Sequence, residues 1–270
     1  MAIKILLNGC NGRMGHMFAK AADRTSDMAV IAGSDIAVAA GSAYEAAVPF
    51  PVFIYENGCS DDLYSKLGGV EFDVIVDFSH PSALSTVLGL AVKCSAPVVL
   101  ATTGFNEGHH AEISAASEKI PVLQSANMSL GINLMSELLR TAAAVLADGF
   151  DIEIVEAHHN QKLDAPSGTA LLLADAINDE LSGSLEYVYD RHNVRAKRDK
   201  KEIGIHTIRG GTIVGEHKVI FAGNNEILEI SHSAASREVF AEGAVRAVRF
   251  ITEKGRKPGR YSIRDVVRKT

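Results

Sequence analysis

The sequence predicts an α/β protein with a Rossmann-like, doubly wound parallel sheet and a second α+β domain built on an open mixed sheet. Three observations support this prediction. The first half alternates short aliphatic runs with helical stretches, which is the rhythm of right-handed β-α-β crossovers. A glycine loop at residues 9–15 (GCNGRMG) separates the first aliphatic run from the first helical stretch. The second half changes to runs that alternate apolar and polar residues between turn signals.

The first half contains strand candidates that are short and rich in Ile, Val, Leu and Phe. A run such as FDVIVDF suits a strand that is buried on both faces. The predicted strands are residues 3–7, 28–34, 72–78, 97–102 and 122–125. The predicted helices between and after them are residues 13–24, 81–93 and 107–119. Pro81 fits the start of its helix because proline is tolerated in a first turn.

The second half is predicted to combine long helices with strands of a half-exposed sheet. Its helices are residues 133–146, 170–181 and 237–252. Its strands are residues 151–157, 203–209, 211–216, 218–222 and 226–231, with turn signals Gly-Gly, Glu-His and Gly-Asn-Asn between them. The open face of this sheet favours oligomerisation. We expect a dinucleotide-binding domain of residues 1–126 plus 237–270, and a substrate-binding and oligomerisation domain of residues 127–236.

Composition narrows the class of protein. The formal net charge of −6 and the absence of tryptophan argue against a nucleic-acid partner. The basic run at residues 191–201 is interpreted as a solvated loop, with steering of an anionic ligand as the alternative. Cys10, Cys59 and Cys94 fit neither a disulfide framework nor a metal-site spacing, which indicates a reducing compartment. With no apolar span of about 20 residues, we expect a cytoplasmic protein without a membrane partner.

The glycine loop predicts a dinucleotide site. Its spacing is G-x-x-G-x-x-G, which suits a tight turn, close approach to a diphosphate and close packing of helix on strand. Asp35, at the end of the second predicted strand, is placed to accept hydrogen bonds from a ribose diol and to repel a 2′-phosphate. We therefore expect NADH to be preferred, with NADPH possible. The alternative is a plain glycine turn followed by an unrelated aspartate.

Two later segments are expected to complete that site. Thr102, Thr103 and Gly104 follow a predicted strand and lie where a loop reaches the nicotinamide side of a dinucleotide. Residues 125–129 (SANMS) follow the last strand of the first half and are expected to form the opposite wall and the hinge. Each segment, taken alone, also fits an ordinary turn.

Residues 156–169 (EAHHNQKLDAPSGT) carry the densest chemistry of the chain. Imidazole changes protonation near neutral pH, and a nearby lysine can act as an acid. His158 and His159 are adjacent at a strand end, so they project in opposite directions and are expected to have different roles. Ser-Gly-Thr at a helix start suits a carboxylate. A metal site is the disfavoured alternative because no ligand spacing is present, and Asp164 is expected to cap the turn.

These segments together resemble the dihydrodipicolinate reductase family over essentially the whole chain. The resemblance depends on residues 9–15 (GCNGRMG), 77–79 (DFS), 101–105 (ATTGF) and 153–170 (EIVEAHHNQKLDAPSGTA). Residues 213–217 (IVGEH) and 243–246 (GAVR) add to it. The family resemblance implies a homotetrameric reductase that transfers hydride from NAD(P)H to 4-hydroxy-tetrahydrodipicolinate, a small dicarboxylate of lysine biosynthesis.

The resemblance also implies roles for individual residues. His158 and Lys162 resemble the family's proton-transfer residues, and His159, Gly168 and Thr169 resemble its substrate-binding set. The implied cofactor contacts are Gly9, Cys10, Asn11, Gly12, Arg13, Met14, Asp35, Ala101, Thr102, Thr103, Ser125, Ala126, Asn127 and Met128. Ala101, Met128 and Ile36 depart from residues that are common in the family. Two other classes remain as alternatives: a non-catalytic dinucleotide-binding module and another two-domain amino-acid dehydrogenase.

Overall fold

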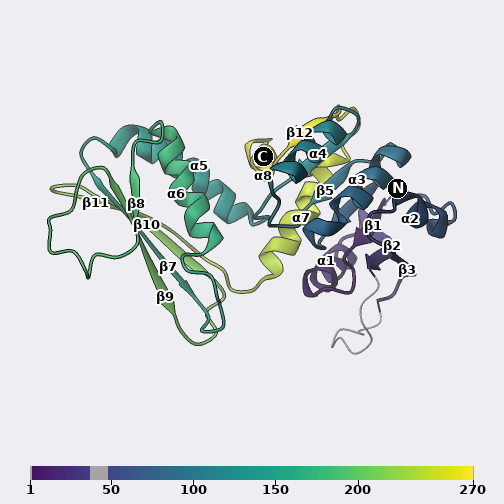
Figure 1. The fold of residues 1–270 in the computed structure, drawn as a ribbon, viewed down its shortest axis with the longest axis horizontal. Helices are drawn as coiled ribbons and strands as arrows, with labels where there is room; N and C mark the ends of the chain where they lie inside the picture. The colour runs from purple at the N-terminus through teal and green to yellow at the C-terminus, as the bar shows by residue number, and fades with distance from the viewer. Residues whose placement is uncertain (1, 37–47, 270) are drawn as a thin grey trace. The chain divides into compact units, whose positions relative to one another are not determined.

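The computed structural model describes residues 2–36 and 48–269. The chain divides into two compact units. The first unit is Met1–Ser129 together with Glu238–Thr270, and the second is Leu130–Arg237. The chain therefore leaves the first unit once and returns to it, as the yellow C-terminal helices beside the purple and blue N-terminal elements show (Figure 1).

A parallel sheet forms the centre of the first unit. Within the described residues it has seven strands in the order β12-β6-β5-β4-β1-β2-β3. The strands are β1 (Ile3–Asn8), β2 (Met28–Ile36), β3 (Val52–Tyr55), β4 (Val74–Asp77), β5 (Val98–Leu100), β6 (Pro121–Gln124) and β12 (Gly259–Tyr261). The order reverses direction between β1 and β4, and this switch point is where Rossmann-type sheets bind dinucleotides.

Helices cover both faces of this sheet. α1 packs on α7 and α7 on α8, whereas α2 packs on α3 and α3 on α4. The helices are α1 (Arg13–Asp23), α2 (Ser60–Leu67), α3 (Leu84–Cys94), α4 (Glu107–Ser117), α7 (Glu238–Ile251) and α8 (Ile263–Lys269). A short 3₁₀ turn, Pro81–Ala83, precedes α3. Aliphatic side chains of the strands and of α2, α3 and α4 form a continuous core on one face.

The second unit is a mixed five-stranded sheet, in the order β11-β10-β7-β9-β8, with two helices on one face. Its strands are β7 (Asp151–His158), β8 (Glu186–Val188), β9 (Glu202–Arg209), β10 (Glu216–Ala222) and β11 (Ile227–Ser233). The helices α5 (Leu130–Leu146) and α6 (Gly168–Glu180) pack on each other and on the sheet. β7 is antiparallel to β10 and parallel to β9. The predicted fold class is thus confirmed.

Some element predictions need correction. The predicted strand 211–216 and the Glu-His turn after it are wrong, whereas the predicted strand 218–222 is confirmed because it lies within β10. His217 lies inside β10, opposite Glu156 of β7 and His232 of β11, so strand pairing on both sides holds it extended. The turn comes earlier, at Gly211, where φ is +46°. The short elements β3, α2, β8, β12 and α8 were not predicted, because three to eight residues carry little periodicity.

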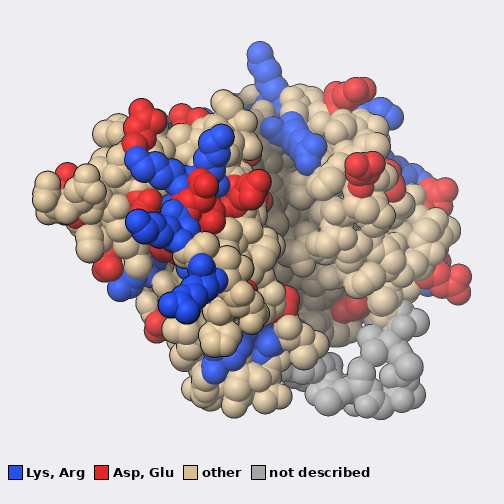
Figure 2. Space-filling view, turned by 60° about the vertical axis from the view of Figure 1, so that its left-hand side comes forward, with Lys and Arg blue, Asp and Glu red and all other residues tan. Residues whose placement is uncertain are grey.

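The basic run is only partly solvated. Arg198 donates hydrogen bonds to the carboxylates of Glu153 at 2.9 Å and Asp151 at 3.0 Å, and Arg191 pairs with Glu153 at 3.1 Å and Glu202 at 2.7 Å. Acidic and basic side chains accordingly intermingle on the face of the second unit that Figure 2 turns to the viewer. The loop is held to the sheet by these ion pairs.

Candidate active site

The glycine loop between β1 and α1 is shaped by approaches that only glycine permits. Gly9 has a φ of +75°, and a Cβ there would lie 2.6 Å from the carbonyl oxygen of Phe78. A Cβ on Gly15 would lie 2.3 Å from the carbonyl oxygen of Gly9, so α1 packs directly against the loop. The N-cap of α1 is Gly12, which has no side chain to cover the first-turn N–H groups. Such N–H groups suit a diphosphate.

Asp35 lies beside this loop, near the end of β2. Its Oδ2 accepts a hydrogen bond from the backbone N–H of Asn11 at 3.0 Å, and its Oδ1 accepts one from the N–H of Ile36 at 2.9 Å. Burial raises the pKa of Asp35, and these two hydrogen bonds act against that rise. The carboxylate is thereby fixed at the edge of the loop.

These groups line one cavity of about 390 Å³. The predicted cofactor residues in its wall are Gly9, Asn11, Gly12, Arg13 and Asp35. The remaining wall residues are Ile36, Phe78, Ser79, His80 and Ala83. Sequence reasoning did not assign the four residues after β4 to a cofactor wall. The signal that would have found them is the position of β4 beside β1 at the switch point.

Other predicted cofactor residues lie outside that wall. Cys10 is fully buried beneath the loop, where burial and the charge of Asp35 raise its pKa to about 12, and Met14 is half-buried in α1.

Residues 101–103 and 125–128 follow β5 and β6, at the same carboxyl edge of the sheet as the glycine loop. Thr102 is buried and Thr103 is exposed. The segment at Met128 is supported by α7, because a Cβ on Gly243 would lie 1.8 Å from the Met128 carbonyl oxygen.

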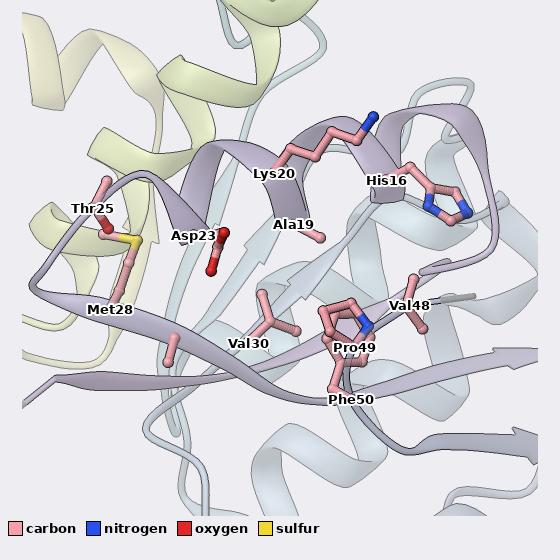
Figure 3. Close-up of a pocket in the computed structure, with 11 residues that line it drawn as sticks. His16, Ala19, Lys20, Asp23, Thr25, Met28, Val30, Val48, Pro49 and Phe50 are labelled. Carbon is pink, nitrogen blue, oxygen red and sulfur yellow. The ribbon is translucent and has the colours of Figure 1, made fainter. Parts of the chain in front are cut away.

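A second hollow in the first unit is separate from this cavity. It has a volume of about 240 Å³ and lies between α1, β2 and residues 48–50 (Figure 3). Its wall includes His16, Lys20, Asp23, Met28, Val30 and Phe50. The two walls share no residue, and none of the predicted cofactor residues lines this second hollow. The glycine-loop cavity is therefore the candidate cofactor site.

In the second unit, Glu156 on β7 is a fully buried carboxylate with several donors. Arg209 binds it in a two-pronged ion pair, with both N–O distances at 2.9 Å. Thr207 Oγ1 donates to it at 3.0 Å and the backbone N–H of Ser167 at 3.1 Å, while Nδ1 of His158 lies 2.6 Å from Oε2. Burial acts to raise the pKa of Glu156, but these hydrogen bonds lower it below its ordinary value. The carboxylate is therefore ionised.

Glu156 fixes the orientation of His158. Because an ionised carboxylate only accepts hydrogen bonds, Nδ1 of His158 carries the hydrogen, and Nε2 is left for a ligand. Gly215 lies next to this nitrogen, and a Cβ there would be 3.1 Å from Nε2. Glycine at this position thus keeps the nitrogen uncovered.

Ser167 connects this network to the start of α6. It is the N-cap of the helix, and its Oγ accepts a hydrogen bond from the N–H of Ala170 at 3.1 Å. The same Oγ lies 3.0 Å from Nε2 of His217, a buried side chain on β10. Burial and the neighbouring His158 lower the pKa of His217 to about 4, so it is neutral. Gly168, in the exposed first turn of α6, follows directly.

Lys162 and His159 lie in the turn that follows β7. Lys162 Nζ forms an ion pair with Asp164 at 2.8 Å, and this contact lowers the pKa of the Asp164 carboxyl. The N-cap of α6 is Ser167 and not Asp164, whose carboxylate pairs with Lys162 within the turn. His159 Nε2 lies 3.2 Å from Nη2 of Arg237. Desolvation, followed by the charges of Arg237 and other neighbours, lowers the pKa of His159.

The predicted substrate-side residues are therefore close together in a strongly polar site of the second unit. Sequence reasoning included Ser167 in the Ser-Gly-Thr helix start, but it missed the contributions of Arg209, His217 and Arg237, which come from three separate segments. Only strand pairing brings Arg209 opposite His158 and His217 opposite Glu156. Among the residues that the structure describes, no His, Cys, Asp or Glu cluster is arranged to hold a metal ion. Across the same residues, no helix has the length and apolar character needed to span a membrane.

The sheet order, the glycine loop and the acidic residue at the end of β2 define an NAD(P)-dependent oxidoreductase with a separate α+β unit. Sequence profiles then give the family. The profile described as dihydrodipicolinate reductase, N-terminus, matches residues 3–128, and the C-terminus profile matches residues 131–267. The chain belongs to the dihydrodipicolinate reductase family, as the sequence resemblance predicted.

Comparisons with individual proteins give the same family. A 4-hydroxy-tetrahydrodipicolinate reductase of Caldanaerobacter subterraneus subsp. tengcongensis is 49% identical, with 100% of both chains covered. One from Clostridium perfringens is 42% identical, with 98% of each chain covered. The solved structure of a dipicolinate-bound dihydrodipicolinate reductase from Paenisporosarcina sp. TG-14 has the same fold. It has a TM-score of 0.79 at 24% identity and covers 97% of this chain and 98% of its own.

The neutral, buried His217 makes stability depend on pH. Its pKa falls from 6.5 to about 4 on folding, so between these values the unfolded chain binds a proton that the folded chain does not. The free energy of unfolding should therefore fall as the pH is lowered from 7 to about 5. Urea titrations at these pH values measure it. In His217→Gln the free energy of unfolding should fall less than in the wild type. In the control His192→Gln, at an exposed histidine, it should fall as much as in the wild type. An equal fall in all three proteins would contradict this account.

Proposed function

We propose that this chain reduces 4-hydroxy-tetrahydrodipicolinate to tetrahydrodipicolinate and water, with hydride from NAD(P)H, in the diaminopimelate route to lysine. The observation that carries this proposal is the similarity to a 4-hydroxy-tetrahydrodipicolinate reductase, which is 49% identical to this chain over its full length. The presence of both His158 and Lys162 disfavours a non-catalytic dinucleotide-binding module. Membership of the family disfavours a different amino-acid dehydrogenase.

The first unit is proposed to hold the dinucleotide, which supplies hydride to C4 of the substrate when it is bound. The fit is supported by the glycine cradle, the uncapped first turn of α1 and the fixed carboxylate of Asp35. The proposed contacts at the diphosphate and adenosine side are Gly9, Cys10, Asn11, Gly12, Arg13, Met14 and Asp35. Those at the nicotinamide side are Ala101, Thr102, Thr103, Ser125, Ala126, Asn127 and Met128.

His158 and Lys162 are proposed to handle the proton. Loss of the 4-hydroxyl leaves a conjugated imine, and after hydride addition at C4 the resulting enamine requires a proton. The ammonium of Lys162 is a donor, and its partner Asp164 lies in an exposed turn from which substrate can displace it. Nε2 of His158 is the nitrogen that Glu156 leaves available. Water must be excluded for these transfers.

His159, Gly168 and Thr169 are proposed to bind the two carboxylates of the substrate. The start of α6, where Gly168 is exposed, offers the positive end of the helix dipole. Arg237, 3.2 Å from His159, adds a permanent positive charge to the same set. The Paenisporosarcina structure is described as dipicolinate-bound, and dipicolinate is an aromatic dicarboxylate of similar size to the proposed substrate. This agreement in ligand class supports the assignment.

A coupled assay tests the proposed reaction. The product of the preceding aldolase step is supplied with the purified protein, and NADH absorbance is followed. We expect enzyme-dependent oxidation of NADH that requires the aldolase product. A protein that binds NADH but gives no turnover in this assay would contradict the proposed function.

Removal of either proton-transfer residue should slow turnover. His158→Ala and Lys162→Ala are each expected to lower kcat by about two orders of magnitude or more, the usual scale for general acid–base groups. The Kd for NADH should stay unchanged, because the glycine loop belongs to the other unit. Lys197→Ala, a change at an exposed lysine, serves as the control and should turn over normally. Normal kcat in both active-site variants would overturn these roles.

We further propose that NADH is preferred over NADPH. The fixed carboxylate of Asp35 suits a ribose diol and repels a 2′-phosphate, and the next residue, Ile36, offers no positive charge. The wild type should have the higher kcat/KM with NADH. In the double variant D35N/I36R, the ratio of kcat/KM for NADH to that for NADPH should fall about tenfold or more. Asp23→Asn, at an exposed carboxylate that does not line the glycine-loop cavity, should leave the ratio unchanged; a clear wild-type preference for NADPH would refute the proposal.

We also propose that the chain assembles as a homotetramer and works in the cytoplasm. The support for assembly is the face of the second sheet opposite α5 and α6, where Ile208 is 51% exposed and Ile227 66% exposed. The native mass in solution tests the tetramer.

A further inference from the structure

Asp77, at the end of β4, is a buried carboxylate that the proposed chemistry does not use. Only 1% of its surface is exposed. Its Oδ1 accepts hydrogen bonds from Asn8 Nδ2 at 2.7 Å and from Ser79 Oγ at 2.5 Å, and its Oδ2 accepts one from Thr102 Oγ1 at 2.7 Å. Burial raises the pKa of Asp77 above its ordinary value, and these hydrogen bonds reduce that rise without cancelling it. All three donors belong to segments that reach the carboxyl edge of the sheet.

The network extends across four neighbouring strands. Asn8 ends β1 and accepts a hydrogen bond from Ser34 Oγ of β2 at 2.8 Å. Thr102 follows β5, and its Oγ1 also accepts the backbone N–H of Ser79 at 3.0 Å. Because β5, β4, β1 and β2 are adjacent in the sheet, this chain of side chains spans the switch point. Asp77 is the residue of this network that accepts hydrogen bonds from both sides of the switch point, from Asn8 on one side and from Thr102 on the other.

The direction of each hydrogen bond follows from the donors that are available. Asp77 accepts from both hydroxyls, since Ser79 Oγ donates to its Oδ1 and Thr102 Oγ1 donates to its Oδ2. Thr102 then has a lone pair for the N–H of Ser79, as the structure shows. Ser79 also lines the glycine-loop cavity. Because the Ser79 hydrogen is directed to Asp77, its oxygen presents only lone pairs to that cavity.

We propose that Asp77 is a positioning residue of the dinucleotide site, and that through it Ser79 Oγ acts only as an acceptor for a hydroxyl or amide N–H of the dinucleotide. This inference rests on the proposed use of NAD(P)H. It places the phosphates elsewhere, at the first turn of α1, because lone pairs backed by a carboxylate repel an anion. Thr102 acts through the same network, since its side chain is buried and committed to Asp77.

Asparagine at position 77 is the sharpest test, because it keeps the shape and replaces one acceptor oxygen with a donor. Thr102 and Ser79 would then have to reorient their hydroxyls. Asp77→Asn should raise the Kd for NADH about tenfold or more, as expected for loss of a buried hydrogen-bond arrangement. The inhibition constant of dipicolinate at saturating NADH should stay unchanged, since its proposed contacts are in the second unit. Binding of NADH is followed by calorimetry.

Three further variants separate positioning from folding. Thr102→Ser keeps the hydroxyl and should retain the wild-type Kd for NADH, whereas Thr102→Val should lose affinity. Ser79→Ala removes the acceptor directly and should raise the Kd for NADH with little change in kcat. The matched control is Asp73→Asn, at an exposed carboxylate that accepts the Lys4 N–H at 2.7 Å, and it should bind NADH normally. If Asp77→Asn does not fold, the serine and valine changes at Thr102 decide.

The outcomes distinguish this inference from the proposed function. If the wild type turns over in the coupled assay while a folded Asp77→Asn keeps the wild-type Kd and KM for NADH, the positioning role is refuted. Wild-type affinity in both Thr102→Val and Ser79→Ala refutes it as well. A wild type that binds NADH without turnover contradicts the proposed reaction alone.

Discussion

The ion pair between Glu156 and Arg209 is the interaction on which the polar site of the second unit depends. A fully buried carboxylate is stable only when it is paired and hydrogen-bonded, and Glu156 meets this requirement with donors from β9 and from the start of α6. Once its charge is fixed, the hydrogen on His158 is fixed at Nδ1, and Ser167 is held at the start of α6. The proposed proton-transfer nitrogen and the proposed carboxylate-binding turn are thus oriented by one buried charge.

The first unit uses the same principle in a different way. Asp77 is also a buried carboxylate, but its partners in the structure are hydroxyls and an amide rather than an arginine. It therefore aligns hydrogens without introducing a positive charge beside a cavity where Asp35 is proposed to select a ribose. In both units, a buried carboxyl group accepts hydrogen bonds beneath the site, and we propose that it sets which atoms the neighbouring side chains present to a ligand.

Much of the fold and part of the site followed from local patterns. Buried aliphatic runs such as residues 74–77 and 98–100 were predictable because strands covered on both faces are apolar throughout. The glycine loop and residues 156–169 were found because their special residue types are contiguous in the chain. The short strands β3, β8 and β12 were not predictable, since their position is set by pairing with neighbours and not by their own periodicity. The Glu-His pair at 216–217 was misread as a turn for the same reason.

The sequence by itself determined the fold class, the family and the chemistry of the two main motifs, because each is encoded by residues that are close together in the chain. Only the tertiary structure decided which distant side chains complete them. Glu156 is 53 residues from Arg209 and Asp77 is 69 residues from Asn8, yet both pairs are in direct contact because strand register places them there. The protonation of His217 was likewise decided by burial, a property of the folded molecule that no local pattern carries.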